Sequence, residues 1–127
     1  MDNERSAKIT ISGQEYELIL TTKATKEIAG RYGGRQNLGD KLMKSENFEM
    51  ALDEIVWWIT LMANQSLLIY NLRNPNDKKN LLTQEEIELL TSPLELATYK
   101  NALMEAMFKG TKRNIASEDD SKNAQTG

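Results

Sequence analysis

The side chains that most often carry out chemistry in proteins are scarce in this sequence. Its 127 residues include no Cys and no His, so thiolate nucleophiles, imidazole bases and a Ser-His-Asp arrangement are excluded. Most transition-metal sites are excluded with them, because those sites depend on Cys and His ligands. The remaining candidates are carboxylates, amines and phosphate-binding glycines, and each must be judged by its spacing.

Two acidic clusters contain the oxygen ligands that divalent cations prefer. They are Asp53-Glu54 and Glu85-Glu86-Glu88. Adjacent side chains on a helix point in different directions, and neither cluster has the spacing of a calcium-binding loop. Glu85 and Glu86 are better explained by capping and by the helix dipole, which favours negative charge at a helix N-terminus. We therefore expect no metal site and no cofactor.

A glycine pair between two arginines is the nearest approach to a phosphate-binding loop. Gly33-Gly34 lies between Arg31 and Arg35, but it lacks the G-x-x-x-x-G-K-[ST] spacing and follows a predicted helix rather than a strand. Glycine after a helix more often marks its end. Because no acid, base and nucleophile converge elsewhere, the sequence predicts a protein that is not an enzyme and has no catalytic residues.

A β-hairpin is predicted at the N-terminus, over roughly residues 7–20. Two segments of alternating apolar and polar residues flank Gly13-Gln14, and Gly at the first central position is typical of a two-residue type II′ turn. The shared apolar face would carry Ile9, Ile11, Tyr16, Leu18 and Leu20. A two-stranded ribbon is marginal in water, so this face must be covered by helices or by another subunit.

Four or five helices are predicted after the hairpin, which makes the fold α+β and mainly helical. The first begins at Thr21 or Thr22 and ends at Gly33-Gly34, and a second covers Leu38 to Lys44. The longest covers about residues 46–71, with Ser45 as its N-cap and Glu46 and Glu49 in its first turn.

Two further helices are predicted in the second half of the chain. Thr83 and Glu86 form a capping box for a short helix, and Ser92-Pro93 begins a last helix that runs to about Lys109 and ends at Gly110. Residues 114–127 have few apolar side chains and are predicted to form a disordered polar tail. We therefore expect a single domain over residues 1–113.

The long predicted helix carries more apolar surface than one face can bury. Consecutive residues lie about 100° apart around a helix, so Trp57 and Trp58 are both buried only if two sides are covered. One is expected in the core, and the other either lies half-buried at its edge or anchors a partner. The sequence does not say which. The candidate partner-binding residues are Trp57, Trp58, Met62 and Tyr70.

Charge and hydropathy exclude two classes of partner. The net charge is −3 and the sequence pI is about 5.1, whereas nucleic-acid binders usually have a basic surface and a high pI. The sequence has no apolar run of 18 residues, so no membrane-spanning segment is expected. The N-terminal residues 1–5 do not resemble a secretory signal. We expect a cytoplasmic protein that binds neither nucleic acid nor membrane.

Seven short segments together resemble a known family. They are Ile9 to Leu18, Thr21 to Ala24, Arg31 to Gly34, Asn37 to Gly39, Ser45 to Phe48, Glu54 to Trp57, and Leu81 to Thr83. In order and spacing, over roughly residues 8–113, the chain resembles the tail assembly chaperones of tailed phages and prophages of Gram-positive bacteria. None of these segments is catalytic.

The resemblance implies a function in virus assembly. Such chaperones bind the long, apolar tape measure protein in the bacterial cytoplasm, keep it soluble while the tail is built, and are absent from the mature virion. It also implies self-association, and the tail tube protein is a second partner to consider. The alternative is a structural protein of the phage, in head–tail joining or tail completion. A transcription regulator is a third class, but the sequence offers no DNA-facing surface.

Overall fold

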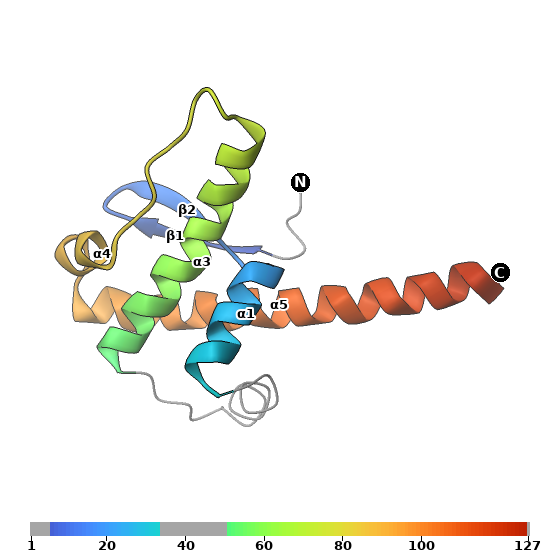
Figure 1. Cartoon of the computed structure of the whole chain (residues 1–127). Coiled ribbons are helices and arrows are strands. Elements are labelled where there is room, and N and C mark those ends of the chain that lie inside the picture. Colours follow the sequence, from blue (N-terminus) through green and yellow to red (C-terminus); the bar gives the residue numbers. More distant parts are fainter. Residues whose placement is uncertain (1–5, 34–50, 127) are drawn as a thin grey trace.

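The computed structural model describes residues 6–33 and 51–126, with side chains described as far as residue 110. An antiparallel hairpin of β1 (Ser6–Ile11) and β2 (Gln14–Ile19) comes first. It is followed by four described helices: α1 (Thr22–Arg31), α3 (Leu52–Arg73), α4 (Gln84–Leu90) and α5 (Pro93–Thr126) (Figure 1). The predicted class, a hairpin followed by helices, is confirmed. The helix predicted at Leu38 to Lys44 lies outside the described residues.

The turn of the hairpin differs from the prediction. Its two central residues are Ser12 and Gly13, with φ of 51° and 82°, and positive φ at both positions defines a type I′ turn. The predicted type II′ turn at Gly13-Gln14 is therefore wrong, because the glycine occupies the second central position. Ile9 now pairs with Tyr16. The pairing shifts by two residues, so the same side chains still share the apolar face.

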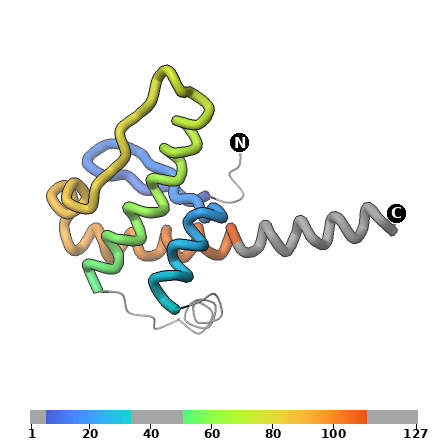
Figure 2. Tube along the Cα trace, in the orientation of Figure 1, coloured from blue at the N-terminus to red at the C-terminus, as the bar shows by residue number. Residues whose placement is uncertain are grey.

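Two helices cover the hairpin. α3 packs against β2, α5 packs against β1, and α3 and α5 contact each other (Figures 1 and 2). The core lies between these elements, and α1 and α4 complete it with Ile28 and Ile87. The largest fully buried side chains include Trp58, Leu18, Ile59, Met62 and Leu103. The predicted need for cover is thus met within the chain.

The free edge of β1 is closed by side chains from α5. Tyr99 Oη donates a hydrogen bond to the carbonyl oxygen of Thr10 at 2.6 Å. Lys109 Nζ donates to the carbonyl oxygen of Ser6 at 3.1 Å and forms an ion pair with Glu105 at 2.8 Å. These contacts satisfy outward-facing carbonyl groups that an exposed strand edge would leave open.

The caps of the short helices are those that the sequence predicts. Thr21 Oγ1 accepts from the backbone N–H of Ala24 at the start of α1, and Gly33 follows its end with φ of 83°. At α4, Thr83 and Glu86 exchange the reciprocal hydrogen bonds of a capping box.

Helix α3 begins later than predicted. Ala51 has an extended backbone with ψ of 156°, so the helix starts at Leu52 rather than near residue 46. The Glu54 carboxylate accepts from the Ala51 N–H at 3.2 Å, and Asp53 and Glu54 supply the acidic first turn. The cap predicted at Ser45 lies outside the described residues. The helix ends at Arg73, and its 22 residues span about 33 Å.

Gly110 does not end α5, although the sequence predicts that it does. The helix continues through this position to Thr126. A Cβ atom at Gly110 would lie 2.8 Å from the Cβ of Leu20, so the glycine allows α5 to approach the end of the hairpin. The disordered polar tail predicted at 114–127 stays a prediction, because the side chains of these residues lie outside the described part of the chain.

We expect Gly110→Ala to destabilise the protein by about 1–3 kcal/mol, because the added methyl group overpacks against Leu20. Helix propensity alone would favour alanine over glycine by about 1 kcal/mol. The sign of the change in the free energy of unfolding therefore tests the packing argument. The matched control is Gly30→Ala in α1, where an added Cβ meets nothing within 4 Å and a gain of about 0.5–1 kcal/mol is expected. Urea unfolding measures both, and stabilisation by Gly110→Ala would refute the close approach.

Candidate functional site

The four predicted partner-binding residues do not lie on one surface. Trp58 and Met62 are 2% and 0% exposed, so their side chains belong to the core and cannot reach a partner in the folded chain. Trp57 and Tyr70 are half-buried. They are separated by about 220° around the helix, so each belongs to a different side of α3. The number of apolar side chains in the sequence does not show which sides of α3 are covered by other elements.

Trp58 is the core tryptophan, and a chain of hydrogen bonds fixes its ring. Its Nε1–H donates to Tyr32 Oη at 2.9 Å, and Tyr32 Oη donates to Glu54 Oε2 at 2.7 Å. Burial, and then the neighbouring Glu54 carboxylate, raise the pKa of Tyr32. The tyrosine therefore keeps its proton and satisfies the buried indole N–H, which ties the end of α1 to the start of α3.

Trp57 lines a shallow groove of about 290 Å³ between α1, α3 and the segment before α4. We call this the Trp57 groove. Its apolar side chains are Trp57, Leu61, Leu68 and Leu81, and Lys23 and Glu27 lie at its rim. The Arg31 guanidinium lies 4.4 Å from the centre of the Trp57 ring, a distance typical of a cation–π contact. The groove presents a narrow apolar stripe with a charged border.

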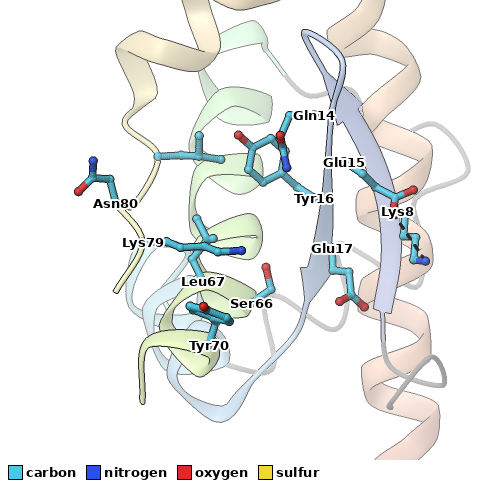
Figure 3. A pocket seen from close by; sticks show the side chains of 11 residues that line it. Lys8, Gln14, Glu15, Tyr16, Glu17, Ser66, Leu67, Tyr70, Lys79 and Asn80 are labelled. Atoms are coloured by element: carbon cyan, nitrogen blue, oxygen red, sulfur yellow. Dashed lines mark ion pairs between the residues drawn. The ribbon is translucent and has the colours of Figure 1, made fainter. Parts of the chain in front are cut away.

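Tyr70 lines a larger groove, of about 620 Å³, on another side of α3 (Figure 3). We call this the β2 groove. β2 forms one wall, residues 79–82 contribute the other, and Ser66, Leu67 and Tyr70 of α3 lie between them. Tyr70 Oη donates to Asp77 Oδ2 at 2.6 Å, which raises the pKa of Tyr70. Lys79 Nζ lies 4.4 Å from the centre of the Tyr70 ring.

Two asparagines of α3 hold the second wall of the β2 groove in place. The Asn64 side chain bonds both the N–H and the carbonyl oxygen of Leu82, at 2.8 and 2.9 Å. The Asn71 side chain does the same for Lys79, at 2.7 and 2.9 Å. The extended segment between α3 and α4 is therefore fastened at both ends. Sequence reasoning missed these residues, although their seven-residue spacing equals about two helical turns.

Among residues 6–33 and 51–110, whose side chains are described, no group of three or more acidic side chains could hold a metal ion. Over the same ranges, no helix combines the length and the apolar content needed to cross a membrane. In the β2 groove, the Ser66 hydroxyl donates to the carbonyl oxygen of Ala63 at 2.9 Å rather than to one of the carboxylates that line the groove. Both grooves are open and combine apolar with charged side chains.

Comparison with protein-family models, with curated proteins and with solved structures finds no match to this chain. Conclusions about its function therefore depend on its own residues and on the geometry of the two grooves.

We expect Tyr32→Phe to lower the free energy of unfolding by about 1–3 kcal/mol at pH 7, because the Trp58 N–H loses its acceptor. A tyrosine whose pKa is raised on folding contributes stability below pH 10 that is lost as pH rises through the folded value. The variant should therefore lose stability less steeply than the wild type above pH 10.

Urea unfolding between pH 7 and pH 11 measures both effects. The control is Tyr16→Phe, whose hydroxyl makes no hydrogen bond within the described residues, and its effect at pH 7 should stay below about 0.5 kcal/mol. An equal loss in the two variants would contradict the role given to Tyr32.

Proposed function

We propose that this protein is a non-enzymatic tail assembly chaperone that binds the tape measure protein of a phage or prophage. The structural observation that supports the proposal is the apolar surface left on α3 and at the junction of α4 and α5. Exposed leucines are prominent within the described residues: Leu72 is 81% exposed, Leu94 78% and Leu89 76%. Apolar side chains gathered in one place, as in the Trp57 groove, commonly mark a site of protein association. The sequence resemblance supplies the identity of the partner.

The Trp57 groove suits one amphipathic helix of the partner. Trp57, Leu61 and Leu68 recur at helical spacing along α3, and Leu81 extends the stripe onto the next segment. A partner helix would place its own apolar stripe along this row, which is the helix-in-groove mode of recognition. Trp57, half-buried and oriented by Arg31, would serve as the anchor, because tryptophan dominates many interface hot spots.

Binding of this kind would keep an apolar partner in solution. The chaperone would shield the helices of the tape measure protein in the bacterial cytoplasm until the tail tube protein assembles around it, and would then leave. The exposed leucines of α4 and α5 give the chain surface for self-association as well. A standard interface buries about 800 Å² per partner. Because the partner is long, the proposed complex would need several grooves or several copies of the chaperone along it.

Co-expression with the tape measure protein encoded beside this chain tests the proposal. We expect the tape measure protein to move from the insoluble to the soluble fraction and to elute together with the chaperone. If it stays insoluble and no complex elutes, the proposal fails. Mass spectrometry of purified virions separates the alternative: a head–tail joining or tail-completion protein would be present in them, whereas a chaperone would be absent.

We expect Leu68→Glu, in the Trp57 groove, to weaken the complex about tenfold or more, because a carboxylate would be buried against an apolar helix. Leu52→Glu at the start of α3 makes the same chemical change at an exposed position outside both grooves and should change affinity less than threefold. Circular dichroism confirms that both variants are folded, and calorimetric titration measures both dissociation constants. Equal weakening by the two variants would remove the Trp57 groove from the binding site.

A further inference from the structure

The two outer edges of the hairpin differ in the hydrogen-bond partners that their backbone groups find in the rest of the described chain. In an antiparallel pair, alternate residues direct their backbone groups to the neighbouring strand or away from it. Ile11 and Gln14 close the two-residue turn as a hydrogen-bonded pair. It follows that residues 6, 8 and 10 of β1 face outward, as do Glu15 and Glu17 of β2. This parity agrees with the α5 side chains that reach the carbonyl groups of Ser6 and Thr10.

Two outward carbonyl groups of β1 therefore have partners in α5, whereas the β2 edge is open among the described residues. Within the described residues, the backbone N–H and carbonyl groups of Glu15 and Glu17 have no partner. This edge borders the β2 groove, where Gln14, Glu15, Tyr16 and Glu17 form one wall (Figure 3). An open strand edge offers a row of donors and acceptors for a further strand.

The side chains around this edge specify the chemistry of such a strand. On one face of β2, the Tyr16 side chain extends toward α3, whose Leu67 and Tyr70 line the same groove (Figure 3); this favours apolar side chains on the incoming strand. On the other face lie the carboxylates of Glu15 and Glu17. Their partners among the described residues are weak ones: Lys8 lies 3.8 Å from Glu15 in an exposed pair, and Ser6 Oγ donates to Glu17 at 3.1 Å.

We propose that the β2 edge binds an extended segment of another protein, in which apolar and basic residues alternate. The segment adds a third strand to the hairpin by β-augmentation. Its apolar side chains enter the β2 groove, and its basic side chains lie opposite Glu15 and Glu17. The site is separate from the Trp57 groove, and it stands whether or not the partner is a tape measure protein.

A second copy of this chain is a poorer occupant of the same edge. If two β2 strands paired antiparallel along their open edges, Glu17 would face either Glu17 or Glu15 of the other copy, depending on the register. Like charges directly opposite in a sheet are destabilising, whereas opposite charges are stabilising. The wall formed by residues 79–82 also stands beside the edge, fastened by Asn64 and Asn71. A single extended segment is therefore the occupant that the charges favour.

The test uses the full chain and a synthetic octapeptide in which Val alternates with Lys, with blocked termini. Fluorescence polarisation gives its dissociation constant, and amide exchange followed by NMR gives its location. We expect the amides of Glu15 and Glu17 to become protected, while that of Tyr16, already bonded within the hairpin, stays unchanged. The same peptide with methylated amides at both Val and Lys should bind at least tenfold more weakly, because it cannot complete a strand ladder in either an antiparallel or a parallel orientation.

Two charge variants complete the test. Glu17→Lys should weaken the peptide about fivefold or more, and Glu88→Lys on α4, with the same change in net charge, should alter binding less than twofold. Equal binding of the methylated peptide, no binding at millimolar concentration, or protection confined to the Trp57 groove would each overturn the proposal. Protection of Glu15 and Glu17 on raising the protein concentration without peptide would identify a second copy as the occupant, and would also overturn it.

Discussion

The structure depends on covering one apolar face of a two-stranded hairpin. Such a hairpin cannot bury its own apolar side chains, and here Ile9, Ile11 and Leu18 are all buried. α3 covers β2 and α5 covers β1, which requires two helices distant in the sequence to meet on the same small sheet. Gly110 allows one of these approaches, and the Tyr99 and Lys109 contacts hold α5 along the strand edge.

In this arrangement, two flanks of helix α3 are only partly covered by other elements. Its core side carries Val56, Ile59 and Met62, and the network of Trp58, Tyr32 and Glu54 fixes its first turns. The two flanks lie beside α1 and beside the fastened segment 79–82, and neither neighbour is large enough to fill the space. Each flank therefore becomes a groove, with Trp57 in one and Tyr70 in the other.

Much of the fold could be predicted from local signals. The hairpin, the caps at Thr21 and Thr83, and the glycine after α1 follow from turn and capping chemistry that acts over a few residues. The hairpin turn was displaced by one residue because Gly13 suits either central position of a two-residue loop. The start of α3 was misplaced because Glu46 and Glu49 fit a first helical turn as well as Asp53 and Glu54 do.

The candidate site could be predicted only in part, because it depends on contacts distant in the sequence. Trp57 and Trp58 are equivalent until the positions of α1 and α5 are known. A glycine that ends a helix and one that admits a close neighbour look alike in a sequence, so Gly110 was misread. Asn64 and Asn71 resemble ordinary polar residues of a helix until the segment that they hold is seen beside them.

The contacts between α5 and β1 also have a consequence for how the chain folds. Tyr99 and Thr10 are 89 positions apart, and Lys109 and Ser6 are 103 apart. Contacts of such high sequence separation slow folding, because a long loop must close before they form. During synthesis the hairpin emerges before α5, so β1 lacks its covering helix until α5 has left the ribosome. β1 is thus made well before the contacts that complete its outer edge.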